Sequence, residues 1–296
     1  MKILVIGGTR FFGIPMVNKL LEEDHRITIA TRGITGDAFG DRVRRVKLNV
    51  YERDSVAKAL SGEKYDVVID KMGYGSLDIK NILDAVECEK FIHMSTAGVY
   101  RLNHMDIKET EFDGGLVRLN WCSRGDVEYD EAKRAAEAAL CQKYSGIDWA
   151  SVRCPYVLGK KDYTERLLFY VEHVMNEIPM RIDNIDAQMS FANADEVGKF
   201  LAFLTHKKQV GPINACARGT ISIREILIYV ERKTGCEAKI DLSGDKAPYN
   251  GTQANSLSIE KAEALGADFK NICDWLPELL DYYIEYIRKE RGQSER

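Results

Sequence analysis

Short apolar runs alternate with helical patterns through the first half of this chain of 296 residues, and this alternation constrains the fold more than any other feature. The runs have the length of buried strands, and the segments between them repeat apolar residues at helical spacing. We expect strands at 2–6, 26–30, 45–48, 66–69, 90–94 and 149–153. We expect helices at 14–21, 55–60, 77–86, from the N-cap Asp126 to about 144, and at 163–176, 195–205, 223–234 and 275–291. This βαβ rhythm predicts an α/β fold with a doubly wound parallel sheet of the Rossmann type.

The first apolar run leads into a glycine-rich turn that opens a helix. Residues 3–6 are followed by Gly7-Gly8-Thr9-Arg10-Phe11-Phe12-Gly13. Such a turn presents backbone N–H groups to a pyrophosphate at the positive end of the helix dipole. The residues that we predict to hold the diphosphate of a dinucleotide are Gly7, Thr9, Arg10, Phe11, Phe12 and Gly13. The alternative is a tight turn without a ligand. Arg10 replaces a glycine, so its side chain must point away from the diphosphate or bind a phosphate itself.

The end of the second predicted strand bears on the choice between NAD and NADP. An acidic residue commonly holds the adenosine ribose there, but this strand ends Ala30-Thr31-Arg32. No carboxylate is present to repel a 2′-phosphate, and Arg32 is able to pair with one. We therefore expect NADP in preference to NAD, with Thr31 and Arg32 beside its ribose. The alternative is that Arg32 is a solvated loop charge.

Tyr129 and Lys133 form the candidate catalytic pair. Their i, i+4 spacing on the predicted helix places both side chains on one face. A tyrosine hydroxyl has a pKa of about 10, and we expect the neighbouring ammonium and a cationic nicotinamide to lower it. Tyr129 would then exchange a proton while hydride moves, and Lys133 would also bind the nicotinamide ribose. Ser95 and Thr96 end the fifth strand, at the edge where open α/β sheets bind ligands. The alternative is a solvated surface pair.

The remainder of the chain gives coarser expectations. Residues 101–125 are polar and irregular, which predicts a long functional or mobile loop, with Trp121 and Cys122 placed to close over substrate. We assign 1–159 and 191–216 to a cofactor-binding Rossmann domain, and 160–190 and 217–296 to a smaller mixed α/β substrate domain. Candidates for a polar substrate pocket are Tyr163, Arg166, Arg181 and Gln188, with ordinary surface as the alternative.

Composition excludes several classes of protein. The net charge of −4 does not favour nucleic acid or an anionic membrane, and no apolar run approaches the roughly 20 residues of a membrane span. Seven cysteines without a C-x-x-C pair suggest reduced thiols and a cytoplasmic location. The five histidines show no metal-ligand spacing, so no metal centre is predicted. Alanines on the Tyr129 helix predict close packing with another helix, either within the chain or across a two-fold homodimer.

These motifs together resemble the extended or atypical branch of the short-chain dehydrogenase/reductase superfamily, which includes the NAD-dependent epimerase/dehydratase family. The glycine turn is similar to that family's G-G-T-G-F-I-G, with Arg10 in place of a glycine. Segment 91–100 (F-I-H-M-S-T-A-G-V-Y) is similar to a motif ending S-[ST]-x-x-V-Y. The resemblance implies that Thr96 supplies a catalytic hydroxyl and Ser95 a supporting one. Tyr129 and Lys133 match the family's Y-x-x-x-K.

The resemblance also implies further cofactor contacts. Segment 152–159 is similar to L-R-P-x-x-V-Y-G, which lies against the nicotinamide, and Asn49-Val50 hold the place of an adenine-contacting pair. The contacts added in this way are Asn49, Val50, Met72, Gly73, Met94, Pro155, Tyr156 and Val157. Segment 191–197 is similar to F-I-H-V-x-D-[VL], but 188–191 lacks the arginine that nucleotide-sugar enzymes carry there.

The predicted function is an NAD(P)-dependent oxidoreductase or epimerase, with Tyr129 as acid/base and a small polar substrate of the sugar or nucleotide-sugar type. A first alternative is RNA binding, because the G-G-T-R-F-x-G turn and segment 66–74 also resemble a subgroup that includes chloroplast stem-loop RNA-binding proteins. The basic residues that would serve it are Arg42, Arg44, Arg45 and Lys47, although the acidic chain favours a solvated loop face there. A second alternative is an NADP sensor without chemistry, against which the presence of Thr96, Tyr129 and Lys133 argues.

Overall fold

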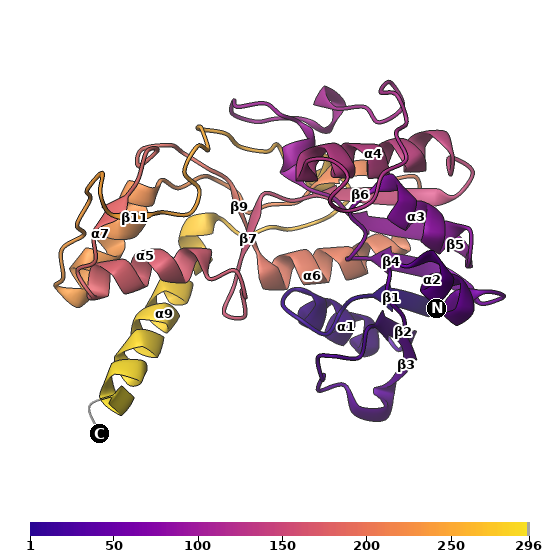
Figure 1. The fold of residues 1–296 in the computed structure, drawn as a ribbon, viewed down its shortest axis with the longest axis horizontal. Helices are drawn as coiled ribbons and strands as arrows, with labels where there is room; N and C mark the ends of the chain where they lie inside the picture. Colours follow the sequence, from indigo (N-terminus) through magenta and orange to yellow (C-terminus); the bar gives the residue numbers. More distant parts are fainter. Residues whose placement is uncertain (295–296) are drawn as a thin grey trace.

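A computed structural model of the chain describes residues 1–294. Its main element is a seven-stranded sheet with the order β10-β6-β5-β4-β1-β2-β3, in which every pair is parallel (Figure 1). The strands are β1 (Lys2–Ile6), β2 (Arg26–Thr31), β3 (Val43–Lys47), β4 (Lys64–Asp70), β5 (Glu87–Met94), β6 (Asp148–Arg153) and β10 (Gly211–Asn214). The chain order reverses beside β1, which is the switch point of a doubly wound sheet. The predicted fold class is confirmed.

Helices cover both faces of the sheet. They are α1 (Gly13–Glu22), α2 (Arg53–Leu60), α3 (Ser76–Leu83), α4 (Tyr129–Gln142) and α6 (Ala194–Phe203). Successive strand residues point to opposite faces, so Ile3 and Val5 pack with α1 and α6, whereas Leu4 and Ile6 pack with α2, α3 and α4. Because both faces are covered, β1 is an unbroken apolar run rather than an alternating one.

A smaller lobe lies beside the carboxyl edge of the sheet (Figure 1). Its elements are β7 (Tyr156–Leu158), α5 (Arg166–Met175), β8 (Met180–Arg181), β9 (Phe191–Asn193), α7 (Ile223–Thr234), β11 (Asp245–Lys246) and α9 (Ile272–Ser294). The short helix α8 (Glu260–Ala264) lies against the sheet, where Ala262 packs in the same core as β10. Its core joins α5, α7 and α9 through residues such as Tyr170, Ile226 and Leu280. Segment 257–269 instead packs with the sheet, through Leu257 and Phe269. The domain limits that we drew from the sequence stay a prediction.

Two predicted helix starts are wrong. We expected Asp126 to cap the helix that carries Tyr129, but its carboxylate accepts a hydrogen bond from the backbone N–H of Ser123 (2.7 Å) and closes a turn, and α4 begins at Tyr129. We expected the next helix to begin at residue 163, but Asp162 forms a similar turn with Thr164, and α5 begins at Arg166. In both places the aspartate accepts a hydrogen bond within a turn that precedes the helix, and it does not cap the helix.

Short 3₁₀ turns complete the described chain: η1 (Gly40–Arg42), η2 (Ala97–Val99), η3 (Glu109–Glu111) and η4 (Leu204–His206). Apart from η3, the segment predicted as a long loop is irregular. Among residues 1–294, no helix combines the length and the apolar character that crossing a bilayer would require.

Candidate active site

A cleft lies at the carboxyl ends of the strands, between the sheet and the smaller lobe. A cavity of about 780 Å³ in this cleft is lined by ten of the predicted catalytic and cofactor-binding residues: Phe11, Phe12, Met94, Ser95, Thr96, Tyr129, Lys133, Pro155, Tyr156 and Val157. An adjoining cavity of about 160 Å³ is lined by eight more: Gly7, Thr9, Arg10, Thr31, Arg32, Asn49, Val50 and Met72. Lys71 and Tyr163 line both cavities. The fold therefore brings the two predicted halves of the site together along one cleft.

The glycine turn has a backbone that side chains would disrupt. Gly7 and Gly8 have φ of +92° and +107°, a region that suits glycine. A Cβ on Gly13 would lie 2.6 Å from the Cα of Gly8, so the turn can close over the start of α1 only without one. Gly13 lines neither cavity, and its role is this close approach. The cradle and the uncapped N-terminus of α1 fit a dinucleotide diphosphate.

Arg10 connects the glycine turn to the smaller lobe. Its guanidinium lies over the ring of Tyr163, with 4.7 Å between its Cζ and the ring centroid. Phe11, with φ of +53°, contacts the same ring edge-on at 6.2 Å. The Lys71 ammonium donates to the carbonyl of Arg10 (3.2 Å). Burial, and next the charge of Arg10, lower the pKa of Lys71 to about 8.

Arg32 is exposed at the end of β2, on the wall of the smaller cavity. Its guanidinium has no ion-pair or hydrogen-bond partner among the described residues, unlike Arg44 and Arg45 nearby. Arg44 pairs with Glu63 and Arg45 pairs with Asp37. The end of β2 therefore offers a free cation, whereas these two members of the predicted basic cluster are already neutralised.

Two buried carboxylates shape the loop after β4. Asp70 accepts hydrogen bonds from the backbone N–H groups of Met72 and Gly73, both at 2.9 Å. Asp78 does the same for Tyr74 and Gly75, at 2.8 and 2.9 Å. A Cβ on Gly73 would lie 2.2 Å from Oδ2 of Asp70. Gly73 lines neither cavity. The loop instead directs the carbonyl of Gly73 toward the Lys133 ammonium.

Lys133 is buried under the cleft. Only 4% of it is exposed, and its ammonium donates to the carbonyls of Gly73 (2.7 Å) and Met94 (2.6 Å). Burial lowers its pKa to about 8, while the carboxylates of Asp70 and Asp78 act in the opposite direction. A lysine ammonium has three N–H groups, so one remains after these two bonds.

Tyr129 is 46% exposed, and its ring meets that of Tyr74 edge-on at 5.5 Å. Loss of hydration in the cleft, and next the neighbouring Tyr74, raise the pKa of Tyr129 to about 12, with Thr96 acting against that shift. Our expectation that Lys133 lowers this pKa is therefore wrong for the protein alone. The physical reason is that loss of hydration disfavours the phenolate more than the neighbouring groups favour it.

Ser95 belongs to a buried network rather than to the reacting face. Its hydroxyl donates to Glu137 at 2.5 Å, and Glu137 pairs with Arg153. Arg153 also donates to the Tyr100 hydroxyl and to the carbonyls of Glu109 and Phe112. The last two bonds anchor the long loop. Thr96, by contrast, uses its side-chain oxygen to accept from the N–H of Gly98 (3.2 Å), beside Tyr129.

Tyr74 lines the larger cavity beside Tyr129, and Arg124 lies over its ring; both were missed in the sequence. The guanidinium of Arg124 lies 4.5 Å from the centroid of Tyr74, and the hydroxyl of Tyr51 donates to the Met72 carbonyl (3.1 Å). The place of Tyr74 after a strand end was a usable signal. Arg124 comes from an irregular loop, whose path has no sequence signature.

The predicted substrate-side residues separate into two groups. Tyr163 and Arg166 line the larger cavity, but Arg181 and Gln188 do not, and Gln188 bonds to Glu225 and Thr220 instead. The expectation that Trp121 and Cys122 close over substrate is wrong. Cys122 is buried against α3, where its N–H is bonded to Ser76, and Trp121 lies over Lys80. Both residues line neither cavity of the cleft.

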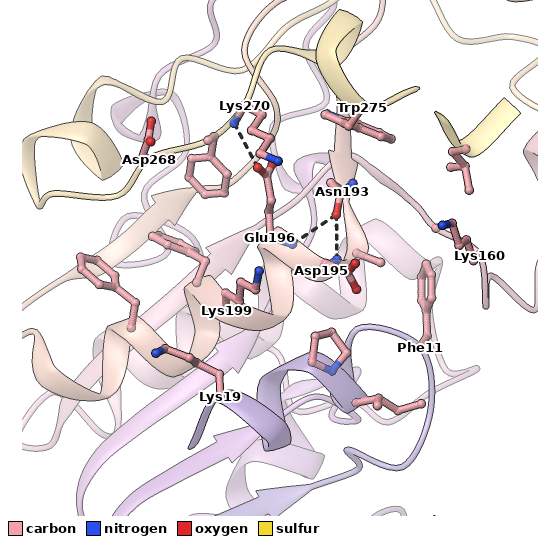
Figure 2. A pocket seen from close by; sticks show the side chains of 18 of the residues that line it. Phe11, Lys19, Lys160, Asn193, Asp195, Glu196, Lys199, Asp268, Lys270 and Trp275 are labelled. Atoms are coloured by element: carbon pink, nitrogen blue, oxygen red, sulfur yellow. Dashed lines mark hydrogen bonds between the residues drawn. The ribbon is translucent and has the colours of Figure 1, made fainter. Parts of the chain in front are cut away.

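A separate cavity of about 680 Å³ lies among α1, α6 and the segment before α9 (Figure 2). It shares Phe11 with the cleft but contains none of the predicted catalytic residues. Asn193 caps α6 by accepting from the N–H groups of Asp195 and Glu196 on its floor. We therefore place the chemistry in the cleft rather than here.

Comparison with known proteins agrees with this geometry. A family model described as NAD(P)H-binding matches residues 7–176. The chain is 28% identical over 312 residues to the chloroplast stem-loop binding protein of 41 kDa b from Arabidopsis thaliana, which covers 94% of this chain and 75% of that protein. It is 31% identical over 78 residues to 2'-dehydrokanamycin reductase of Streptomyces kanamyceticus, which covers 26% of this chain and 22% of that one.

Solved structures share the fold along almost the whole chain. The UDP-glucose 4-epimerase of Thermotoga maritima, solved with UDP-glucose, matches with a TM-score of 0.74 and 18% identity, covering 98% of this chain and 99% of its own. The enzyme of the same name from Thermus thermophilus, solved with NAD, matches with a TM-score of 0.71 and 19% identity, covering 96% and 99%. At such identities the likeness concerns the fold alone.

Proposed function

Because the chain belongs to the NAD(P)H-binding family and has the fold of the extended short-chain dehydrogenases, we propose that it is an NADP-dependent reductase or epimerase. Its substrate would be a small polar carbonyl or hydroxyl compound of the sugar or nucleotide-sugar type. The observation that carries the proposal is the meeting of Thr96, Tyr129 and Lys133 in a cavity that adjoins the glycine turn. A nicotinamide cofactor, when bound, supplies or accepts the hydride.

The residues of the cleft divide the remaining work. A pKa of about 12 keeps Tyr129 protonated at neutral pH, so its hydroxyl is ready to donate a proton to a substrate oxygen. Thr96 would hold that oxygen beside Tyr129. Lys133 would use its third N–H to bind the nicotinamide ribose, while its other two fix it to the carbonyls of Gly73 and Met94.

Tyr129→Phe tests the chemistry. We expect this change to lower turnover by about 10²- to 10⁴-fold, because it removes the proton donor, and to leave stability nearly unchanged, because the ring is 46% exposed. Turnover would be followed on a panel of aldoses, keto sugars and UDP-sugars, by the absorbance of the reduced nicotinamide and by chromatography of the sugar. Tyr282→Phe, an equivalent change on an exposed tyrosine of α9, is the control. Undiminished turnover in Tyr129→Phe would remove Tyr129 from the mechanism.

Arg32→Ala tests the cofactor preference. A charge-assisted hydrogen bond contributes about 1.5–3 kcal/mol, so we expect NADPH to bind roughly ten- to a hundredfold more weakly and NADH to be unaffected. Thermal shifts in titrations of both cofactors would measure this. Arg26→Ala, at the opposite end of the same strand, is the matched control. An equal loss for NADH and NADPH would show that Arg32 does not read the 2′-phosphate.

The likeness to a stem-loop binding protein supports RNA binding as the second candidate. Pairing of Arg44 and Arg45 with acidic side chains weakens the basic face that would serve it. RNA binding that falls steeply with salt, together with no stabilisation by NADPH, would favour this candidate. An NADPH sensor without chemistry would bind the cofactor and show no turnover in either the wild type or Tyr129→Phe.

A further inference from the structure

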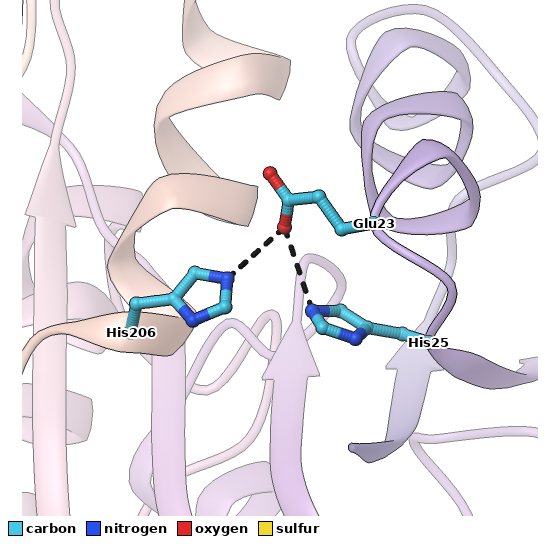
Figure 3. A group of neighbouring side chains, drawn as sticks. All are labelled: Glu23, His25 and His206. Atoms are coloured by element: carbon cyan, nitrogen blue, oxygen red, sulfur yellow. Dashed lines mark hydrogen bonds and ion pairs between the residues drawn. The ribbon is translucent and has the colours of Figure 1, made fainter.

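Glu23, His25 and His206 meet at the amino-terminal edge of the sheet, the edge opposite the cleft (Figure 3). Glu23 follows the last residue of α1, His25 precedes the first residue of β2, and His206 ends η4 after α6. The cofactor-binding turn lies at the other end of β1. The three side chains therefore lie far from the cleft in which we propose that hydride transfer takes place.

The distances suit a small tetrahedral ion. Oε2 of Glu23 lies 3.0 Å from Nε2 of His206 and 3.4 Å from Nε2 of His25. One ligand atom from each residue lies within 4.8 Å of the other two. Zinc bonds of about 2.0–2.2 Å at tetrahedral angles put neighbouring ligand atoms about 3.3–3.6 Å apart. The distance between Glu23 and His25 lies in this range, and a small movement of the half-exposed His206 away from Oε2 of Glu23 would bring the second distance into it.

His25 gives a second, independent indication. Its side chain is only 8% exposed, yet its buried Nε2 has no hydrogen-bond partner that meets the usual geometry among the described residues. A buried polar nitrogen of this kind costs stability unless something satisfies it. Nε2 faces Glu23 in Figure 3, so a metal ion between them would satisfy it.

Two cations also lie close to the cluster, on its outer side. The Lys19 ammonium is 3.3 Å from Oε1 of Glu23, and the amino nitrogen of Met1 is 3.4 Å from Nδ1 of His25. Both therefore contact the atoms that the ion would not use. An imidazole that binds a metal through Nε2 carries its proton on Nδ1, so the contact between Nδ1 of His25 and the amino nitrogen would give way when the ion binds.

We propose that Glu23, His25 and His206 bind a divalent transition metal, with Zn²⁺ as the ion of best fit and water as the fourth ligand. Two imidazoles and a carboxylate select such ions over Mg²⁺ and Ca²⁺, which prefer oxygen alone. The site would join the end of α1 to the end of α6, two helices that pack on the same face of the sheet. Its role would be to stabilise that layer.

The experiment uses the untagged full chain with the exposed thiol removed by Cys273→Ser, because a free thiol also binds zinc. Zn²⁺ affinity is measured by competition with a chromogenic chelator, and Co²⁺ is added as a spectroscopic probe. We expect one equivalent to bind with the visible spectrum of a tetrahedral nitrogen and oxygen site, without the near-ultraviolet band of a thiolate. We also expect Zn²⁺ to raise the melting temperature.

His206→Gln should weaken Zn²⁺ binding by at least about tenfold, since even loss of an outer-shell partner has an effect of that size. It should abolish the tetrahedral Co²⁺ spectrum and the zinc-dependent thermal shift. His206 is half exposed, so the variant is expected to fold. His104→Gln is the matched control, because His104 also pairs with a carboxylate, that of Glu111, outside the cluster. Unchanged affinity in His206→Gln, an equal loss in His104→Gln or an octahedral Co²⁺ spectrum would each overturn the proposal.

Discussion

One face of α4 carries two kinds of polar site, one at the cleft and one in the core. Tyr129, Lys133 and Glu137 follow one another at i, i+4 and i+8, and they are 46%, 4% and 1% exposed. At the core end, Glu137 holds Arg153, whose Nε, Nη1 and Nη2 groups together donate to Glu137, Tyr100, Glu109 and Phe112. At the cleft end, Lys133 makes two hydrogen bonds of three and Tyr129 remains a neutral phenol.

The difference teaches how a single helix serves stability and chemistry. A guanidinium with all its donors paired has nothing left for a ligand, so the Arg153 network is structural. The Lys133 ammonium keeps one N–H after its two bonds, and under the proposed function this N–H binds the nicotinamide ribose. The two ends are linked because Ser95, which donates to Glu137, directly precedes Thr96 in the cleft.

Glu137→Gln tests the core end and should have the largest effect on stability. Removing one charge of a buried pair leaves Arg153 uncompensated, which costs about 3–5 kcal/mol. The free energy of unfolding, from urea denaturation, measures it. Glu131→Gln is the control on the same helix, because its pair with Arg101 is exposed and contributes at most about 1 kcal/mol. Equal losses in the two variants would mean that the buried network stabilises no more than a surface pair.

Ser95→Ala tests whether the core end of α4 can be disturbed without disturbing the cleft end. A hydrogen bond to a charged group contributes about 1.5–3 kcal/mol, so we expect a loss of that size in stability. Turnover should fall far less than in Tyr129→Phe. Ser151→Ala, in the neighbouring strand, removes a buried hydroxyl that has no partner among the described residues and should be nearly neutral. A large loss of turnover with unchanged stability would instead show that Ser95 takes part in the reaction.

Most of the sheet could be predicted because its central strands are buried on both faces and read as apolar runs. The edge strand β10 was not predicted, since its sequence Gly-Pro-Ile-Asn is not an apolar run. The pair Tyr129 and Lys133 could be predicted because helical spacing alone puts them together. The role of Ser95 could not, since its partner Glu137 lies 42 positions away and only the fold sets their distance. The start of α4 was misplaced because an aspartate that closes a turn looks the same in the sequence as one that caps a helix.

Long-range convergence also explains why Arg124 was missed and why the proposed metal ligands have no sequence signature. Arg124 reaches Tyr74 from a loop with no periodic pattern. We predicted no metal centre because the histidines lack local ligand spacing, yet the fold brings His206 within 3.0 Å of Glu23. Spacing rules detect ligands that share a segment and are blind to those that two distant segments contribute.

The smallest effect concerns the charge on Lys133. Its pKa in the folded protein is about 8, below its unfolded value of about 10.4, so between these values the unfolded chain binds more protons and stability rises with pH. Wild type should therefore gain about 1 kcal/mol relative to Lys133→Met between pH 8 and pH 9. The difference between the two proteins isolates Lys133 from Lys71, whose pKa is lowered in the same direction. Parallel stability curves over this range would show that the ammonium keeps an ordinary pKa, and that the cleft end of α4 is as well satisfied as its core end.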